Sequence, residues 1–392
     1  RLLNTHKLTC HKDKAFCPIC QKPVVVKPEN EDDIGVDKFR LHLSKCYKCA
    51  KDSTLLKLPA EGDKMKFKNH KNKIERPYEA YADLESTLCK TGDDKLIAKH
   101  KPNSACIYLV CTYDSSKNRL WHYVGEDCVE QMLLELNRMA EECIADMRSN
   151  ERMKFTCEDK NRFYNATHCH ICKERFIKGD KRVRDHDHKT GQFRGAAHNK
   201  CNINYFANRY LPVIFHNLRG YDSHFIIRKA YEINKELNHE INVIPNSYEK
   251  FMSFSIGDLK FIDSLQFMNS SLEKLVENLY EKEDKYKNFH SLKSIYPQHY
   301  DLLCQKGFYP YEWVDDISKL DHIGLPPREE FYSSLQQKGI KPENYDHAQN
   351  VYKTLNCQSF RDYHLTYLIC DVLLLADVFE HFRKTCINYY KL

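Results

Sequence analysis

A chain of 392 residues, 42% of them hydrophobic and 12% aromatic, is long and apolar enough for two or three packed domains, which excludes an intrinsically disordered chain. Its longest apolar stretches fall far short of the ~20 residues that a membrane-spanning helix needs. The net charge of +6 is unevenly placed, since residues 1–80 and 151–210 each carry seven more basic than acidic residues. Such segments fit contacts with phosphates, although a solvated lysine-rich surface explains the charge equally well.

The 18 cysteines indicate metal sites rather than a disulfide framework. Six lie in three pairs separated by two residues, with histidines nearby, and this pattern is typical of zinc sites in a reducing compartment. We therefore expect an intracellular, nuclear protein. The chain opens at Arg1 without a methionine or a signal-peptide pattern, so we expect it to be part of a longer protein.

Residues 1–50 are a predicted zinc-finger region, because they are rich in cysteine and histidine and lack long apolar periodicity. The predicted ligands of a C2HC finger are Cys17, Cys20, His42 and Cys46. Cys49 competes with Cys46, and the spacing does not decide between them. His6 and Cys10 repeat half of the pattern, so we expect the chain to begin within a tandem array. DNA binding and a structural or protein-binding role are both open for this finger, which a basic linker, residues 51–76, follows.

An α/β domain is predicted from residue 77 onward, and a module of different composition interrupts it. Alternating apolar residues predict strands at 77–88, 105–113 and 119–124, and helical spacing predicts an amphipathic helix over 127–147. Residues 155–206 are basic and rich in cysteine and histidine, which indicates an insert. The predicted domain therefore consists of residues 77–154 and 207–392.

The second part of this domain resumes with a strand and a helix over residues 211–231. A hairpin is predicted over 251–267, and a helix capped by Ser270 follows it. Residues 284–357 are rich in tyrosine and proline and predict irregular structure, whereas 359–392 have the periodicity of one long helix.

Acidic residues recur where these elements can bring them together. Asp83 and Glu85 alternate at the end of a predicted strand, so both side chains lie on one face. Paired acids repel unless a cation lies between them, and such oxygen ligands hold Mg²⁺ or Mn²⁺. Asp222 begins a predicted helix, and Tyr367 and Asp371 lie one turn apart on another. An unpaired acid in an apolar run is costly to bury, which favours a metal or partner for Asp371; exposed strand-end acids and an ordinary core tyrosine are the alternatives.

In this order the patterns D-x-E, N-x-x-x-Y-D and Y-x-x-x-D resemble the three exonuclease motifs of family B DNA polymerases. The resemblance implies a ribonuclease H-like 3′→5′ exonuclease, in which four acids bind two Mg²⁺ or Mn²⁺ ions and a tyrosine orients the attacking water. Carried onto this chain, the metal ligands would be Asp83, Glu85, Asp222 and Asp371, and the water-positioning residue would be Tyr367.

The segment FHNLRGYDSHFII is especially similar to the protein-primed subgroup of these polymerases. The resemblance implies that His216, Asn217 and Tyr221 contact the single-stranded primer end. The segment SSLEKL resembles an element that contacts single-stranded DNA or a terminal protein, which makes Ser271 and Leu272 candidates; a helix cap explains the serine at least as well. The expected partners are thus DNA with single-stranded 3′ ends and a terminal protein.

A second zinc site is predicted inside the insert. Cys169 and Cys172 are followed at zinc-knuckle distance by His198 and Cys201. Four such ligands make a closed structural site, which a module of this size needs in order to fold. Between the two pairs, the sequence RDHDH places histidines beside acids, and Asn202 follows the last ligand, which suits one-metal phosphodiester hydrolysis.

Residues 169–204 resemble the recombination endonuclease VII branch of the HNH, or ββα-metal, nucleases. The resemblance implies that His186 is the general base and that Asp185 and Asn202 bind one Mg²⁺ at the scissile phosphate. Contacts with the DNA backbone would come from Lys181, Arg182, Arg184 and Arg194. The acid that the family has three positions after the asparagine is Tyr205 here, so catalysis on branched DNA and DNA binding without catalysis both stay open.

The palm domain of family B polymerases is expected to lie outside this chain. The segment SIYP at 294–297 resembles a palm motif, but Ser291 stands where that motif needs an aspartate. The finger, the three exonuclease motifs and the insert together resemble polymerases of Polinton or Maverick elements. We therefore predict the exonuclease part of such a polymerase, which shortens primers and does not extend them. The alternative is a non-catalytic DNA-binding fragment that uses its zinc modules.

Overall fold

The computed structural model describes residues 14–17, 19–20, 22–25, 35–50, 60–62, 69–90, 98–205, 209–247 and 250–390. The chain divides into two compact units, residues 1–67 and residues 68–392, and each is described by itself. His6 and Cys10, the predicted second half-finger, lie outside the described residues. Among the described helices, none combines the length and hydropathy that a membrane crossing requires.

In the first unit a short hairpin precedes one helix. Strand β1 (Lys14–Phe16) pairs antiparallel with β2 (Pro23–Val25), and α2 (Gly35–Ala50) follows. This ββα order brings cysteines from the hairpin and residues from the helix into one small element.

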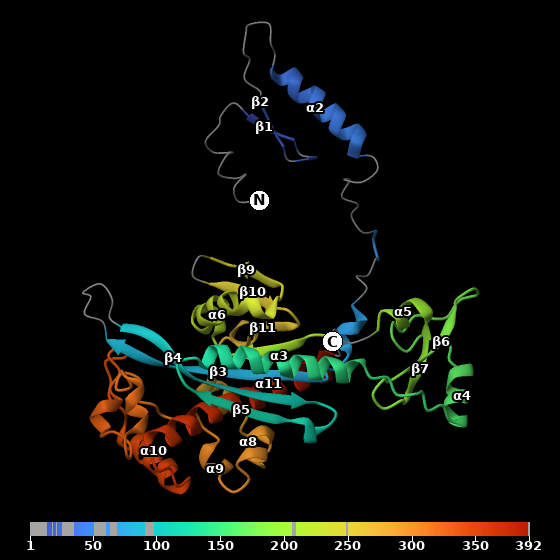
Figure 1. Ribbon diagram of the computed structural model, residues 1–392. Helices are drawn as coiled ribbons and strands as arrows, with labels where there is room; N and C mark the ends of the chain where they lie inside the picture. Colours follow the sequence, from blue (N-terminus) through green and yellow to red (C-terminus); the bar gives the residue numbers. More distant parts are fainter. Residues whose placement is uncertain are drawn as a thin grey trace. The chain divides into compact units, whose positions relative to one another are not determined.

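A seven-stranded mixed sheet organises the second unit (Figure 1). In spatial order its strands are β5 (Arg119–Val124), β4 (Ala98–Cys111), β3 (Tyr78–Lys90), β8 (Leu211–Phe215), β11 (Leu259–Asp263), β10 (Phe251–Ile256) and β9 (Ile241–Pro245). The three central strands β3, β8 and β11 are parallel, and the outer strands continue the sheet antiparallel on both sides. The carboxyl ends of the central strands therefore meet at one edge of the sheet.

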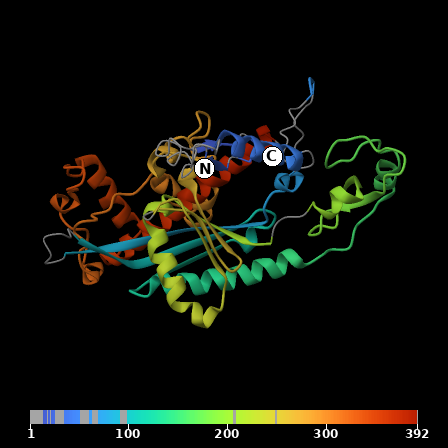
Figure 2. The ribbon, with the colours of Figure 1, turned by 90° about the horizontal axis from the view of Figure 1, so that it is seen from above.

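Helices α3 (Cys128–Arg148) and α6 (Asp222–Leu237) cover one face of this sheet, and Figure 2 shows them on the side opposite the long C-terminal helix. Successive strand residues point to opposite faces, so Ala80 and Ala82 of β3 pack on this side. The apolar stripe of α3 meets them with Met132 and Leu136, which are fully buried.

Helix α11 (Phe360–Tyr390) covers the other face of the sheet. Tyr81 of β3 and Ile214 of β8 share a core with the apolar residues of α11, and α7 (Leu272–Glu277) and α8 (His290–Ile295) pack on the same helix. The second unit is therefore a mixed sheet between two helical layers, which confirms the predicted α/β class.

Residues 284–357 are more regular than predicted. They contain α8, α9 (Tyr300–Leu303), α10 (Pro342–Thr354) and the 3₁₀ turns Ile317–Asp321 and Arg328–Phe331. Pro342 begins α10 rather than preventing it, because the first helical N–H needs no partner. Buried Ala348 and Val351 join α10 to the core around α11, so tertiary packing supports a segment with weak local signals.

Four further 3₁₀ turns lie in connections: His70–Lys73, Ser115–Lys117, Leu218–Gly220 and Ser264–Gln266. The cap of α7 is Ser271, the serine for which a helix cap was the alternative to a DNA contact, and Ser270 precedes it. The Oγ atom of Ser271 accepts a hydrogen bond from the Lys274 N–H at 3.4 Å.

The insert has a two-stranded sheet of its own. Strands β6 (Arg182–His186) and β7 (Phe193–His198) pair antiparallel and lie between α4 (Cys157–Tyr164) and α5 (Asn199–Ile203) in the chain. Two small apolar clusters, one around Phe163 and one around Ile171, form its core. Cores of this size rarely stabilise a fold without a metal or another constraint.

Candidate active sites and metal centres

Three predicted acids meet at one edge of the central sheet. Asp83, Glu85 and Asp371 each offer a carboxylate oxygen, and these oxygens all lie within 4.8 Å of one another. Asp83 and Glu85 extend from β3, and Asp371 comes from the middle of α11, which packs on that face. The fold thus brings together acids from opposite ends of the second unit.

Asp222, the fourth predicted acid, is the first residue of α6 and is buried near this cluster. Its charge raises the pKa of Glu85. The Oδ1 atoms of Asp222 and Asp371 are both buried without a hydrogen-bond partner in the described protein. Unpaired carboxylate oxygens are costly in a protein interior, so they fit divalent cations, which take oxygen ligands.

Burial and mutual repulsion favour the protonated forms of Asp83, Glu85 and Asp222 when no cation is bound. Burial and the charge of Asp371 raise the pKa of Asp83 to about 7, although Lys306 opposes this. Burial, Asp83 and Asp371 raise the pKa of Glu85 well above its usual range, and burial and Asp83 do the same for Asp222. A divalent cation reverses this balance, because it favours the ionised carboxylates.

Lys306 is a member of this site that the sequence analysis missed. Its Nζ forms an ion pair with Asp371 Oδ2 and lies 5.2 Å from the centre of the Tyr367 ring. Burial alone would lower the pKa of Lys306, but the charge of Asp371 outweighs burial and raises it, so the amine stays charged. At the next residue, Gly307, a Cβ atom would lie 2.8 Å from Tyr367 Cδ2, so the approach of this loop requires glycine.

Tyr367 is held in place as a neutral phenol. Its hydroxyl lies 2.7 Å from that of Tyr311, and the rings of Tyr309 and Tyr367 are 4.9 Å apart. Burial, followed by the charges of Asp371 and Glu85, raises the pKa of Tyr367 well above its ordinary value. The phenol can therefore orient a water molecule at neutral pH, but it does not act as a base.

A buried hydrogen-bond chain lies behind this tyrosine pair. Ser104 Oγ donates to Asn103 Oδ1 at 2.9 Å and lies 2.7 Å from His364 Nε2. His364 Nδ1 lies 2.7 Å from the Tyr309 hydroxyl. Because the serine hydrogen is used, His364 donates from Nε2 and accepts the Tyr309 hydrogen at Nδ1. Burial lowers the pKa of His364 to about 3, which keeps this arrangement neutral.

Asp263 shapes the loop that carries the predicted primer contacts. Its Oδ1 accepts the backbone N–H of Asn217 at 2.9 Å, and its Oδ2 accepts that of Arg219 at 3.2 Å. Asn217 has a left-handed backbone, with φ 69° and ψ 27°, which asparagine tolerates better than most residues. Phe215 of β8 lies opposite Asp263 of β11, so the loop and the carboxylate share one sheet edge.

His216 and Tyr221, which flank that loop, are also fixed by hydrogen bonds. His216 Nδ1 lies 2.9 Å from Ser264 Oγ, and the Tyr221 hydroxyl lies 2.7 Å from His100 Nδ1. Burial lowers the pKa of His216, which therefore favours the neutral imidazole. These contacts hold both side chains at the same edge as the acids.

Ser271 and Leu272 lie in different environments. Ser271 is exposed at the start of α7, where it acts as the helix cap. Leu272 is only 7% exposed and packs in the core around α11. Its burial argues against the predicted contact of Leu272 with DNA, because a leucine at the first helical position faces the core.

The four predicted zinc ligands of the insert converge. Ligand atoms of Cys169, Cys172, His198 and Cys201 all lie within 4.8 Å of one another. His198 Nδ1 lies 3.4 Å from Cys172 Sγ, and its Nε2 lies 3.2 Å from Asp180 Oδ2. A carboxylate that contacts the second nitrogen of a histidine ligand fixes the ring and makes it more basic. The four ligands therefore fit zinc, and Asp180 is a supporting residue of this site that was not predicted.

The backbone around Cys169 favours its thiolate, the form that binds metals. Burial raises the pKa of this thiol, but hydrogen bonds from the backbone N–H groups of Cys172, His198 and Ile171 outweigh burial and lower it to about 7.

Asp185, the predicted metal ligand of the insert, already has partners on both oxygens. Arg194 donates to Oδ1 at 2.9 Å and to Oδ2 at 2.8 Å, and His170 Nε2 lies 2.9 Å from Oδ2. Burial raises the pKa of Asp185, but the hydrogen bonds from His170 and Arg194 outweigh it and lower the pKa. Arg194 was predicted to contact the DNA backbone and is instead bound to Asp185, so both residues need a rearrangement to reach the predicted partners.

Tyr205 stabilises this pairing at the position where the related family has an acid. The Arg194 guanidinium lies 5.0 Å from the centre of the Tyr205 ring, and the His170 ring lies 6.0 Å from it. An acid at this position would compete with Asp185 for the arginine. On β7, a Cβ atom at Gly195 would lie 2.7 Å from His170 Cγ, so glycine is what allows His170 to reach Asp185.

Two histidines, not one, are candidates for the base of the insert. The rings of His186 and His188 lie 4.8 Å apart. Burial and the charges of His186 and Arg194 lower the pKa of His188, which favours its neutral, basic form. Asn202 Oδ1 is buried without a hydrogen-bond partner in the described protein, as expected of an atom that can accept a metal or a donor.

The other predicted phosphate contacts of the insert differ in their availability. Arg182 donates to the Ala166 carbonyl at 3.0 Å and packs 4.9 Å from the Phe163 ring centre, so it has a structural role. Lys181 and Arg184 are exposed.

In the first unit the predicted finger ligands also converge. Ligand atoms of Cys17, Cys20, His42 and Cys46 all lie within 4.8 Å of one another. His42 Nε2 lies 3.3 Å from both Cys20 Sγ and Cys46 Sγ. The side chain of Cys49, the alternative ligand, lies outside the described residues. Four converging soft ligands fit a second zinc ion.

Comparison with known families gives two matches. Residues 146–211 match the family model of recombination endonuclease VII, and residues 203–392 match that of DNA polymerase type B, organellar and viral. No curated protein and no solved structure matches the chain. The matches support an enzyme that acts on DNA and the two families that the sequence motifs indicate: one segment is similar to recombination endonuclease VII, and the segment after it is similar to organellar and viral type B DNA polymerases.

Proposed function

We propose that this chain is the 3′→5′ exonuclease part of a protein-primed family B DNA polymerase. Residues 77–154 and 207–392 form a ribonuclease H-like exonuclease domain, and residues 155–206 are an HNH insert. The observation that carries the proposal is the convergence of Asp83 and Glu85 from β3 with Asp371 from α11. Asp222 of α6 is buried near them, and Asp222 and Asp371 each have a buried oxygen without a partner in the described protein. The match of residues 203–392 to type B polymerases supports the same reading.

The four acids Asp83, Glu85, Asp222 and Asp371 would hold two Mg²⁺ or Mn²⁺ ions. Ions of this kind supply an activated water and stabilise negative charge on the phosphate. The tyrosine and lysine at the site add positioning and charge. Tyr367, fixed by Tyr311, orients the water, and charged Lys306 forms an ion pair with Asp371 beside the phosphate.

The loop at the carboxyl end of β8 would receive the 3′ end of the DNA strand. His216, Asn217 and Tyr221 lie on this loop, and Asp263 fixes its backbone. Exposed Ser271 is a further contact for single-stranded DNA or a terminal protein. A fixed loop beside the acids lets the strand end enter in one orientation, as exonucleolytic cleavage requires.

Degradation of 5′-labelled single-stranded DNA with Mg²⁺ or Mn²⁺ tests this proposal. The variants Asp83→Ala and Asp371→Ala are each expected to slow shortening from the 3′ end by at least about 1,000-fold, because each removes a metal ligand. Asp258→Asn is the matched control, since Asp258 is an exposed acid in the turn between β10 and β11. Undiminished degradation by the double variant would show that the exonuclease lies elsewhere.

A second candidate function is endonuclease activity of the insert. It is favoured by the two histidines beside the zinc-supported strand pair and by the match to recombination endonuclease VII. Branched DNA should be cleaved by the Asp83→Ala, Asp371→Ala chain, and His186→Ala or His188→Ala should abolish cleavage. Cleavage that survives both histidine substitutions would exclude this site, and absence of cleavage would favour DNA binding alone.

The finer assignments rest on sequence resemblance. We extend the proposal to an element of the Polinton or Maverick type, with a terminal protein as partner and a nuclear location. Sequencing of the full transcript tests the element type, because a palm domain should follow in the same frame. Imaging of a tagged full-length protein tests the location.

A further inference from the structure

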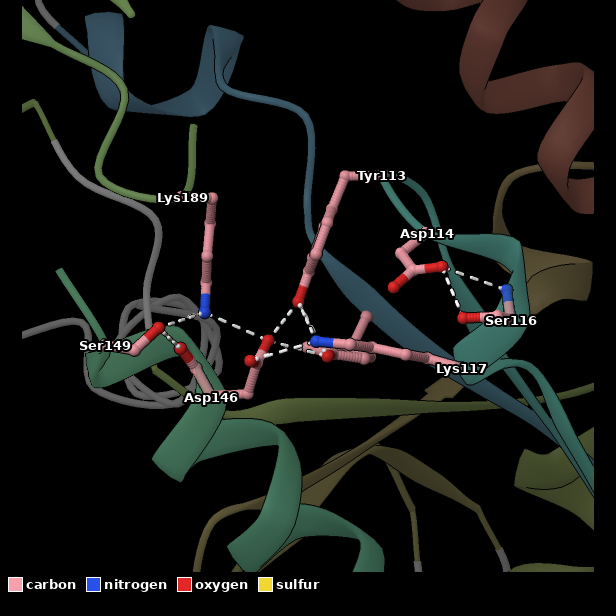
Figure 3. A network of polar contacts seen from close by, with 8 residues as sticks. Tyr113, Asp114, Ser116, Lys117, Asp146, Ser149 and Lys189 are labelled. Carbon is pink, nitrogen blue, oxygen red and sulfur yellow. Dashed lines mark hydrogen bonds and ion pairs between the residues drawn. The ribbon is translucent and has the colours of Figure 1, made fainter. Parts of the chain in front are cut away.

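Lys189 connects the insert to the central-sheet domain. It lies in the turn between β6 and β7, and its Nζ is 2.9 Å from Asp146 Oδ2 and 2.8 Å from Ser149 Oγ (Figure 3). Asp146 belongs to the last turn of α3, on the sheet domain. The backbone adds to this contact, because the Glu151 N–H donates to the His188 carbonyl at 2.7 Å.

Asp146 is itself held by the sheet domain. Tyr78 of β3 donates to its Oδ2 at 2.7 Å. The Tyr113 hydroxyl donates to the same atom, and Lys117 Nζ donates to Oδ1 at 3.0 Å (Figure 3). Three donors from the sheet domain thus fix the carboxylate that receives Lys189. The ion pair between Asp146 and Lys189 therefore fixes the position of this turn of the insert relative to the sheet domain.

The turn that carries Lys189 is tightly built. Asp187 Oδ1 accepts the backbone N–H groups of Lys189 at 2.8 Å and Thr190 at 3.0 Å. Gly191 has a positive φ of 71°, and a Cβ atom there would lie 2.5 Å from the Arg152 carbonyl oxygen. Because this turn follows directly after His186 and His188, fixing it also fixes the candidate catalytic residues of the insert.

A cleft of about 410 Å³ lies between this turn and the sheet domain. The insert contributes His188, Arg194 and Tyr205 to its lining, and the sheet domain contributes Thr112 and Tyr113. The charged residues of the lining are Lys73, Lys189, Arg194 and Arg209 against Glu75 and Asp187. The lining therefore has two more basic than acidic residues, which favours a polyanion. Because Lys189 is paired with Asp146 and Arg194 with Asp185, a bound phosphate chain would compete with these two carboxylates.

We propose that this cleft binds the phosphate backbone of the DNA strand on which the insert acts. The sheet domain is then one wall of the endonuclease site, and Asp146 and Lys189 are positioning residues that set the width of the cleft. This inference rests on the proposed endonuclease function of the insert. It goes beyond that function because it assigns substrate contacts to Lys73 and Arg209, which lie outside the insert.

The salt dependence of binding to a branched DNA tests whether Lys73 and Arg209 of the cleft contact phosphates. The double variant Lys73→Gln, Arg209→Gln is made in the Asp83→Ala, Asp371→Ala chain, and binding is measured by fluorescence anisotropy over a series of KCl concentrations. Each lost phosphate contact should reduce the slope of log K against log salt by about 0.9, so a reduction of about 2 is expected. Lys178→Gln is the control, because Lys178 is an exposed lysine of the insert outside the cleft lining. A slope equal to that of the control would overturn the proposal.

A double-mutant cycle tests the two positioning residues. Asp146→Asn and Lys189→Gln should each lower kcat/KM for branched DNA about tenfold, and the double variant should lose no more than either single variant, since one ion pair is broken in all three. Hydrogen exchange of residues 186–192 should accelerate equally in the three variants, and Lys178→Gln should leave it unchanged. Additive losses, or unchanged exchange, would overturn the positioning role. If the parent chain does not cleave, the endonuclease function fails, while the salt slope and the exchange rates still decide whether the cleft exists and binds DNA.

Discussion

The acids at the edge of the central sheet and the acid of the insert are similarly buried but differently satisfied. Asp222 and Asp371 are 4% and 3% exposed, and each keeps a buried oxygen without a partner. Asp185 is also 3% exposed, but Arg194 and His170 occupy both of its oxygens. Burial of an acid alone therefore does not identify a metal ligand, and the partners of its oxygens are the better guide.

This difference predicts how each region responds to metal ions. The sheet acids repel one another, so a divalent cation lowers the energy of the folded state directly. At the sheet edge Lys306 pairs with one oxygen of Asp371 and leaves the other acids without a basic partner of this kind among the described residues. In the insert Arg194 pairs with both oxygens of Asp185, so a metal can bind there only after Arg194 moves. The sheet site is thus prepared for cations from solution, whereas the insert holds its acid in a closed pair.

The largest expected effect concerns the predicted zinc site of the insert, the module that also contains the Asp185–Arg194 pair. Cys172→Ser should reduce the zinc content from two ions per chain to one and unfold the insert, because its apolar clusters are too small to hold it. Elemental analysis and limited proteolysis measure the two effects. Cys157→Ser, at an exposed cysteine of the same insert, is the control. A protease-resistant insert without its zinc would contradict the prediction.

Removal of Lys306 should destabilise the sheet site only when metal is absent. Lys306→Met leaves Asp371 without its cation, and breaking a buried ion pair costs about 3–5 kcal/mol. Mn²⁺ should recover much of this loss, because it supplies the missing charge. Urea unfolding with EDTA and with Mn²⁺ measures the difference, and Lys338→Met, at an exposed lysine, is the control. Equal losses in both conditions would mean that Lys306 supports packing rather than charge balance.

A smaller effect is expected behind the zinc ligand of the insert. Asp180→Asn weakens the hydrogen bond to His198 Nε2 and should lower zinc affinity about 10- to 100-fold. Competition with a chelator of known affinity measures it. Glu158→Gln removes an exposed carboxylate from the same insert and should leave the affinity unchanged. An Asp180→Asn chain that binds zinc as tightly as the parent would remove Asp180 from the metal centre.

The smallest effect is a pH dependence of the metal-free sheet site. The pKa of Asp83 is raised from 3.8 to about 7, so the folded chain binds this proton more tightly than the unfolded chain. The proton on Asp83 therefore stabilises the folded state fully below the unfolded pKa of 3.8, and this contribution is lost as pH rises to the folded pKa of about 7. In EDTA, Tm should therefore fall by a few degrees between about pH 5 and pH 7.5, and Asp83→Asn should make this fall smaller. A fall of the same size in both chains would assign it to other groups, such as Glu79 and Asp377, whose pKa values burial also raises to about 7.

The sequence predicted those parts of the sites that lie in local patterns. Strand alternation placed Asp83 and Glu85 on one face, helical spacing placed Tyr367 and Asp371 on another, and cysteine spacing located both Cys/His clusters. Each of these signals depends on neighbours a few residues apart. Three of the four predicted acids and both predicted Cys/His sets lie close together among the described residues, whereas their roles stay predictions.

The missed residues depend on contacts between distant segments. Lys306 reaches Asp371 from a loop in a region predicted to be irregular, and Asp263 meets Asn217 only because β8 and β11 are parallel neighbours. Likewise, no spacing rule indicates that Arg194 pairs with Asp185 rather than with DNA, because that choice depends on the strand register. Strand order and register, not composition, decide these partners.

The two ends of the insert return to the same short stretch of β3 and the residues before it. Before the insert, Asp146 is bound by Tyr78; after the insert, the carbonyl of Tyr210 accepts a hydrogen bond from Arg76 at 2.6 Å, and the Arg76 guanidinium lies 4.0 Å from the Tyr210 ring centre. Because the entropy of closing a loop grows only slowly with its length, modules of very different size can be accommodated between these two anchors. Gain, loss or exchange of a whole module at this junction would therefore leave the pairing of β3 with β8 intact.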